Sequence, residues 1–285
     1  MDKTRILIAG GDMRQIYCAL RLAETHDVSV AGFAPEHIPP QLAQASAGIN
    51  SRKYDCAVLP VPPIDSSGCI NTPLGGEVLS AERVRSLLRS GAAVLTGKAD
   101  PELDTLFAGH PVIDYMQREE LCLRNAIPTA EGAVQLAVSE LPVTLNGLSV
   151  LIAGLGRIGT ALAQILRGFG AEVTAAVRNS QGAARAELLG IRSVRTENIS
   201  PDYGLVFNTV PRLIFTRPLL EQFSADTLII DLASRPGGID FSAAADLGIR
   251  AVWALGLPGK TAPVTAGEII AGTVCDILEE RSRTV

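Results

Sequence analysis

Short apolar runs alternate with amphipathic stretches along the first part of the chain. "RILIAGG" predicts a strand that ends in a Gly-Gly turn, and the residues after it are apolar at helical spacing. "VSVAGFAP" and "DCAVLPVPP" predict two more strands, and "AERVRSLLRSG" predicts a helix with a glycine stop before the strand "AAVLTG". Strands that alternate with helices are typical of a parallel sheet, so we expect an α/β domain over residues 1–125.

A helical segment separates this pattern from a second one. Residues 126–142, which contain "IPTAEGAVQLAVSELP", predict an interdomain helix that Thr129 caps and Pro142 ends. Residues 143–262 repeat the rhythm, with strands expected in "LSVLIAG", "AEVTAAV", "LVFNTV", "TLIIDLA" and "RAVWAL". After the loop "GLPGKTAP", residues 263–285 predict a last helix that packs back toward the domain junction. The predicted fold class is α/β, with two doubly wound, Rossmann-like parallel-sheet domains joined by interdomain helices.

Composition and charge narrow the class of partner. A length of 285 residues suits two domains, and a net charge of -5 without a basic stripe argues against sequence-independent nucleic-acid binding. Five single cysteines, no signal-peptide pattern and no long apolar run predict a cytoplasmic protein with reduced thiols. The three histidines all lie within the first 110 residues and form no ligand cluster, so we expect no metal.

Three glycines mark the start of the second domain. Gly154, Gly156 and Gly159 form G-x-G-x-x-G between a predicted strand and a predicted helix. The first glycine permits a tight turn, the second lets a pyrophosphate approach the backbone, and the third allows close helix–strand packing. The helix N-terminus supplies amide donors to the anion. A plain strand–helix turn is the alternative, but the flanking elements favour a dinucleotide site.

The next strand ends in an arginine instead of an acid. Arg178 stands where a carboxylate would bind the ribose diol of NAD, and its guanidinium suits the 2′-phosphate of NADP. A solvated arginine at a strand end is the alternative. The expected cofactor-binding residues are Gly154, Gly156, Arg157, Ile158, Gly159, Arg178, Asn179, Ser180, Thr209 and Pro211.

Several loops at predicted strand ends carry cations that suit an anionic substrate. These loops include "GGDMRQ", "TGKADP", "DLASRPGG" and "GLPGKTAP", in which Pro-Gly is expected to set a tight turn that projects a lysine. A carboxylate among them could orient a cation or act as a helix cap. The sequence identifies no catalytic acid or base. The expected substrate-binding residues are Asp12, Arg14, Lys98, Arg235, Pro258, Gly259 and Lys260.

The chain resembles a known family through motifs spread over nearly its whole length. "GGDMRQ", "LPVP", "TGKADP", "IPTAEGAVQLA", "GLGRIG", "DLASRPGG" and "GLPGKTAPVTAG", in this order, are similar to the A subunit of dipicolinate synthase. The resemblance implies an NADP-linked oxidation of dihydrodipicolinate, or of its hydroxylated tetrahydro precursor, to pyridine-2,6-dicarboxylate during sporulation. It also implies a heteromeric complex with a flavoprotein-like B subunit. The sequence does not fix the oligomeric state and also permits a homo-oligomer.

Two other functions stay open. A D-2-hydroxyacid dehydrogenase has a similar two-domain layout and would use Arg235 for its substrate, but it needs a histidine in the cofactor domain, and this chain has none there. A non-catalytic subunit that senses NADPH is the other alternative, because the sequence offers few acid–base groups.

Overall fold

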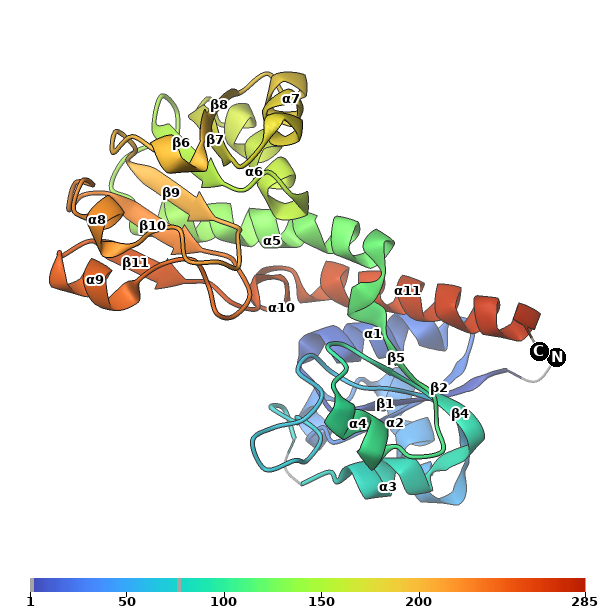
Figure 1. Cartoon of the computed structure of the whole chain (residues 1–285). Helices are drawn as coiled ribbons and strands as arrows, with labels where there is room; N and C mark the ends of the chain where they lie inside the picture. Colours follow the sequence, from blue (N-terminus) through green and yellow to red (C-terminus); the bar gives the residue numbers. More distant parts are fainter. Residues whose placement is uncertain (1–2, 76–77, 285) are drawn as a thin grey trace. The chain divides into compact units, whose positions relative to one another are not determined.

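The structure is a computed structural model that describes residues 3–75 and 78–284 (Figure 1). The chain divides into two compact units. Unit 1 consists of Met1–Asn125 and Ala262–Val285, and unit 2 of Ala126–Thr261. Each unit has its own parallel sheet, as the alternating pattern of strands and helices predicted.

Unit 1 is built on a five-stranded parallel sheet of order β2-β1-β3-β4-β5. Its strands are β1 Arg5–Ala9, β2 Asp27–Ala31, β3 Tyr54–Val58, β4 Leu88–Thr96 and β5 Val112–Asp114. Its helices are α1 Met13–Ala23, α2 Pro40–Ala47, α3 Ala81–Ser86, α4 Pro101–Leu106 and α11 Pro263–Thr284, with short 3-10 turns η1 Pro35–His37, η2 Ile49–Ser51 and η3 Tyr115–Gln117. Ile6 and Ile8 pack with α1 and α11 on one face of the sheet, whereas Leu7 and Ala9 pack with α3 and α4 on the other.

Unit 2 is built on a six-stranded parallel sheet of order β11-β10-β9-β6-β7-β8. Its strands are β6 Ser149–Ala153, β7 Glu172–Val177, β8 Arg192–Arg195, β9 Leu205–Asn208, β10 Leu228–Asp231 and β11 Arg250–Trp253. Its helices are α6 Arg157–Gly168, α7 Ser180–Leu188, α8 Arg217–Leu220, α9 Phe241–Asp246 and α10 Leu257–Thr261, with the 3-10 turn η4 Thr196–Asn198. The strand order reverses at β6, and the crevice beside such a switch point is where doubly wound sheets bind their ligands.

The central helix begins earlier than the sequence suggested. α5 spans Glu119–Glu140, so Thr129 lies inside the helix and is not its cap, and Pro128 does not interrupt it. Two acidic residues in the first turn suit the positive end of the helix dipole. Ala126 and Ala130, on either side of the proline, are buried, and their packing outweighs the local signal that the proline gives.

The predicted helix over residues 81–91 is wrong in its second half. α3 ends at Ser86, and the residues after it form the first part of β4. Leu88 pairs with Tyr54 and Ala93 with Cys56, so the residues between them bulge out of the ladder. Gly91, with a φ of +73°, lies within this irregular part of the strand and does not end a helix.

Candidate functional site

The β6–α6 turn of unit 2 uses its three glycines in three different ways. Gly154 has a φ of +89°, and a Cβ there would lie 2.6 Å from Val210 Cγ2. A Cβ on Gly159 would lie 2.1 Å from the carbonyl oxygen of Gly154. At Gly156, by contrast, no heavy atom of the described chain beyond its neighbours lies within 4 Å of an added Cβ. Two glycines therefore allow the turn to pack, and the third keeps the backbone open at the N-cap of α6.

Side chains from two other elements hold this turn in place. The Thr209 hydroxyl, just beyond β9, lies 3.0 Å from the carbonyl oxygen of Ala153 and 3.1 Å from that of Gly154. Arg185 of α7 donates from Nη1 to the carbonyl of Leu155, at 2.8 Å. Thr209 and Arg185 thus brace the turn. No local pattern pointed to Arg185, since its partner is a carbonyl thirty residues away.

Arg178 follows β7 directly, and its side chain is exposed. Asn179 is the N-cap of α7, and its Oδ1 accepts from the Gly182 amide at 3.0 Å. Ser180 is the first residue of α7. The guanidinium of Arg195, at the end of β8, donates to the carbonyl of Arg178. Residues 178–182 therefore present Arg178 and a helix N-terminus and contain no carboxylate, whereas Arg195 beside them pairs with Glu197 at 3.9 Å.

The corresponding turn in unit 1 is filled by the chain itself. Gly10 and Gly11, after β1, have φ values of +73° and +107°. The Gly11 amide donates to the carbonyl oxygen of Asn71 at 2.8 Å, and a Cβ on Gly10 would lie 2.6 Å from the same oxygen. The amides that would receive a phosphate are thus covered by a neighbouring loop.

Asp12 and Arg14 form a fixed pair at the start of α1. Asp12 caps the helix by accepting from the Arg14 amide at 3.0 Å, and it accepts from Nε and Nη2 of Arg14 at 2.9 and 2.8 Å. Burial tends to raise the pKa of Asp12, but the hydrogen bonds and charge of Arg14 outweigh it and hold that pKa below its ordinary value. Burial likewise tends to lower the pKa of Arg14, yet its bond to Asp12 leaves that pKa raised. Asp12 is therefore ionised at neutral pH and orients Arg14.

The loop after β4 brings Lys98 to the same edge of the unit 1 sheet. Lys98 has a φ of +69°, and Asp114 holds that conformation by accepting from the amides of Lys98 and Ala99, both at 3.1 Å. A Cβ on Gly97 would lie 2.0 Å from Val61 Cγ2, and the carbonyl of Val61 accepts from Arg14 Nη2 at 3.4 Å. A non-glycine residue in this conformation persists only where its surroundings impose it, which is common at ligand sites.

In unit 2, the loop after β10 is built around a buried carboxylate. Asp231 accepts from Asn208 Nδ2 at 2.7 Å and from the amides of Ala233 and Gly238 at 3.0 and 2.8 Å. The loop carries Arg235, whose Cζ lies 5.4 Å from the ring centre of Trp253. The indole ring in turn donates to the carbonyl of Ala233 at 2.9 Å. Asp231 thus shapes the loop, and Trp253 supports an exposed guanidinium.

The loop expected at "GLPGKTAP" is instead the short helix α10. Pro258 falls in its first turn, where a proline is tolerated, and its side chain is buried. The helix is held by α5, because a Cβ on Gly132 would lie 2.6 Å from Thr261 Oγ1 and 3.1 Å from Leu257 Cβ. Of the three residues predicted here, Pro258 is buried, Gly259 is half-buried and Lys260 is exposed.

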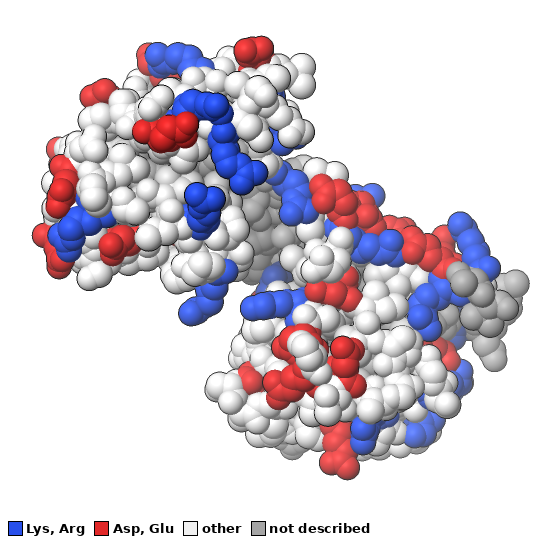
Figure 2. All heavy atoms as spheres, in the orientation of Figure 1, with Lys and Arg blue, Asp and Glu red and all other residues white. Residues whose placement is uncertain are grey.

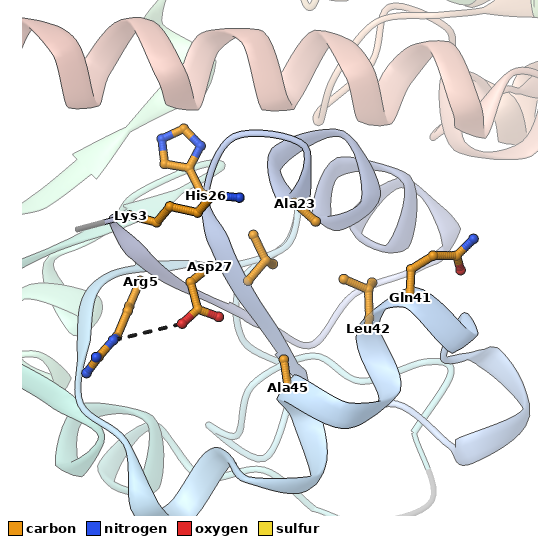
Figure 3. Close-up of a pocket in the computed structure, with 9 residues that line it drawn as sticks. Lys3, Arg5, Ala23, His26, Asp27, Gln41, Leu42 and Ala45 are labelled. Atoms are coloured by element: carbon orange, nitrogen blue, oxygen red, sulfur yellow. Dashed lines mark ion pairs between the residues drawn. The ribbon is translucent and has the colours of Figure 1, made fainter. Parts of the chain in front are cut away.

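A separate hollow of about 350 Å³ lies at the opposite edge of the unit 1 sheet (Figure 3). Arg5 and Asp27, at the amino ends of β1 and β2, line it together with His26. Asp27 is paired with Arg5 at 3.9 Å and with Arg52 at 3.0 Å. Because the predicted site residues follow the carboxyl ends of the strands, this hollow is not part of their site.

Two absences concern the described residues. No group of three or more histidine, cysteine, aspartate or glutamate side chains among them could hold a metal ion. Within the same residues, no helix has the length and apolar character needed to cross a membrane.

The two halves of the chain match the models of two different protein families. Residues 5–116 match the model of the N-terminal domain of the dipicolinate synthase A subunit, and residues 127–240 match that of the D-isomer specific 2-hydroxyacid dehydrogenase NAD binding domain. The second match shows a domain that binds a nicotinamide dinucleotide and supports an oxidoreductase.

The relatives that match over the whole chain are A subunits of dipicolinate synthase. The A subunit of dipicolinate synthase from Bacillus subtilis (strain 168) is 31% identical over 97% of this chain and 96% of its own. The crystal structure of its Bacillus halodurans counterpart has a TM-score of 0.88 at 28% identity and covers 97% of this chain and 98% of its own. The structure of the dipicolinate synthase A chain from Bacillus subtilis has a TM-score of 0.86 at 29% identity and covers 100% of this chain and 99% of its own. The resemblance seen in the sequence motifs is confirmed, and the chain belongs to the family of the A subunit of dipicolinate synthase.

Proposed function

We propose that this chain is the NADP-dependent oxidoreductase component of a dipicolinate synthase. It oxidises dihydrodipicolinate, or its hydroxylated tetrahydro precursor, to pyridine-2,6-dicarboxylate in the cytoplasm during sporulation, together with a flavoprotein-like B subunit. The observation that carries the proposal is the open backbone at Gly156 beside a turn at Arg178 that lacks a carboxylate, in a chain of this family.

The cofactor residues follow from the turn geometry. The amides at the start of α6, with Arg157 and Ile158 as its first two residues, would receive the pyrophosphate at Gly156. Arg178 and the Ser180 hydroxyl would bind the 2′-phosphate, while Asn179 fixes the turn by capping α7. Thr209 and Pro211 follow β9 on the side of the turn where the nicotinamide half of a dinucleotide lies in this fold.

The proposed substrate residues are cations in the loops and helices that follow the strands. In unit 1 these are Arg14, oriented by Asp12, and Lys98, held by Asp114. In unit 2 they are Arg235, supported by Trp253, and Lys260 on α10. Guanidinium and ammonium groups of this kind suit the carboxylates of a planar diacid. Pro258 and Gly259 contribute the backbone that places Lys260.

The proposed reaction requires few catalytic side chains. Aromatisation of a dihydropyridine removes one hydride and one proton, and the hydroxylated tetrahydro precursor must also lose its hydroxyl as water. A bound NADP⁺ would accept the hydride, and the proton would pass to solvent. The residues of this chain bind the diacid and orient the reacting carbon. A reaction of this kind needs no histidine in the second domain, and that domain contains none. A D-2-hydroxyacid dehydrogenase, by contrast, needs a histidine there as its acid–base group.

A turnover experiment tests the proposal. The purified chain is mixed with dihydrodipicolinate and either NADP⁺ or NAD⁺, with and without the B subunit, and both the reduced cofactor and pyridine-2,6-dicarboxylate are measured. We expect equal amounts of the two products, formed faster with NADP⁺. If NADPH binds tightly but no turnover occurs in either arm, the chain senses the nucleotide and does not oxidise the substrate.

A further inference from the structure

A second arginine reaches the turn that follows β7. Arg195 is the last residue of β8 and pairs with Val177, the last residue of β7. Its guanidinium donates to the carbonyl of Arg178. Because the register sets these two strand ends side by side, Arg195 lies at Arg178 although the two are seventeen residues apart.

The positive charge of Arg195 is only weakly balanced. It pairs with Glu197, whose Oε1 lies 3.9 Å from Nε, and the two side chains are 53% and 67% exposed. Ion pairs between exposed side chains contribute little to stability, so Glu197 holds Arg195 only weakly. A phosphate can therefore replace Glu197 as the partner of Arg195. Figure 2 shows blue side chains, with red ones beside them, over the region of unit 2 where Figure 1 labels β7, β8 and α6.

The groups around the turn are those that bind a phosphate monoester. Arg178 and Arg195 offer two guanidinium groups, and Ser180 adds a hydroxyl at the start of the nine-residue helix α7. The Oδ1 atom of Asn179 is turned onto the Gly182 amide, so it does not face a phosphate with its negative end. A phosphate monoester carries nearly two negative charges at neutral pH, which one exposed arginine does not balance.

We propose that Arg195 is a second specificity-determining residue for the 2′-phosphate of NADP and acts together with Arg178. The inference deepens the proposed function and rests on it. A dinucleotide without the 2′-phosphate gains nothing from the charge of Arg195, so this residue changes the preference between the two cofactors. A bracing role would have another signature, because a disturbed turn weakens the binding of both dinucleotides.

Calorimetry of the full chain with NADPH and NADH distinguishes these roles. Arg195→Ala is expected to weaken NADPH about tenfold, the effect of one charge-assisted hydrogen bond, and to leave NADH within about twofold. Arg195→Lys, which keeps the charge, should recover part of the loss. Arg192→Ala is the matched control. Arg192 lies at the other end of β8, its side chain is 71% exposed, and it pairs with Glu172. This variant should change neither affinity.

Two results would overturn the inference while leaving the proposed function intact. Equal losses for NADPH and NADH in Arg195→Ala would show that the residue only braces the turn, and unchanged affinities would show a solvated side chain. A wild-type chain that binds neither dinucleotide would instead contradict the proposed function, and this inference with it. Circular dichroism of each variant checks that the fold is retained.

Discussion

The three glycines of the β6–α6 turn differ in what a side chain would meet, and this difference is open to test. At Gly156 an added side chain enters open space, so Gly156→Val should keep the fold and block the approach of the pyrophosphate. We expect NADPH binding to be abolished in calorimetry while circular dichroism stays that of the wild type. Full NADPH affinity in this variant would mean that the cofactor lies elsewhere.

Gly159 provides the contrast to Gly156. A Cβ there would lie 2.1 Å from a backbone oxygen, which cannot rotate away. Gly159→Ala should therefore lower the free energy of unfolding by about 1–3 kcal/mol, the usual effect of overpacking. Denaturant unfolding measures it, and equal stabilities for the two variants would contradict the roles assigned to these glycines.

The proposed role of Arg178 in cofactor choice is tested at the same scale. Its charge-assisted bonds to a 2′-phosphate should favour NADPH over NADH by roughly 1.5–3 kcal/mol. Arg178→Ala should remove most of that difference in a competitive titration with the two cofactors. An unchanged preference for NADPH in the variant would show that Arg178 is a solvated arginine at a strand end.

The charge of Asp12 predicts how the stability of the fold depends on pH. Its folded-state pKa lies below the ordinary value of 3.8, so the pair with Arg14 stabilises the fold above about pH 4 and that stabilisation is lost as the pH falls through the folded pKa. Asn is also a good helix cap, so Asp12→Asn removes mainly the charge. Because the pair is partly exposed, we expect a loss of at most about 1 kcal/mol at pH 7 and a smaller one near pH 3, measured by urea unfolding. A loss that grows on acidification would contradict the account.

At the scale of elements, sequence periodicity located most of the strands but placed the helix ends poorly. It missed the edge strands β5 and β8, because β5 has three residues and β8 is mostly polar and exposed. β1, β6, β7 and β10 are apolar runs bounded by turns, and all four were predicted. α5 and α10 were misjudged because Pro128 and Pro258 are local signals for a helix end or a loop, whereas burial against the rest of the unit decided the outcome. A close contact such as that between Gly132 and Thr261 joins distant parts of the chain and has no local signature.

The helix α10 places Lys260 differently from the expected turn, and its role is open to test. Lys260 is exposed at the end of this helix. If it binds a substrate carboxylate, Lys260→Ala should weaken dipicolinate binding by about 1.5–3 kcal/mol and leave NADPH affinity nearly unchanged. A titration that shows unaltered diacid affinity, or an equal loss for NADPH, would remove α10 from the substrate site.

At the scale of the whole molecule, the sequence indicated two α/β units and one dinucleotide turn, because both have regular local patterns. The residues that support the site were not foreseeable in the same way. Asp114 reaches Lys98, Arg185 reaches Leu155 and Arg195 reaches Arg178 through strand register and helix placement. The substrate was suggested by the family resemblance and not by spacing, since cations at strand ends suit many anions.

The central claim is that an NADP cofactor and a pyridine diacid are bound by the residues named above. Electron density of a crystal soaked with NADP and dipicolinate tests it most directly. We predict the pyrophosphate at Gly156, the 2′-phosphate on Arg178, and the nicotinamide against the ring of a diacid whose carboxylates meet the cations of the strand-end loops. A 2′-phosphate away from Arg178, or a diacid bound out of reach of the nicotinamide, would contradict the account.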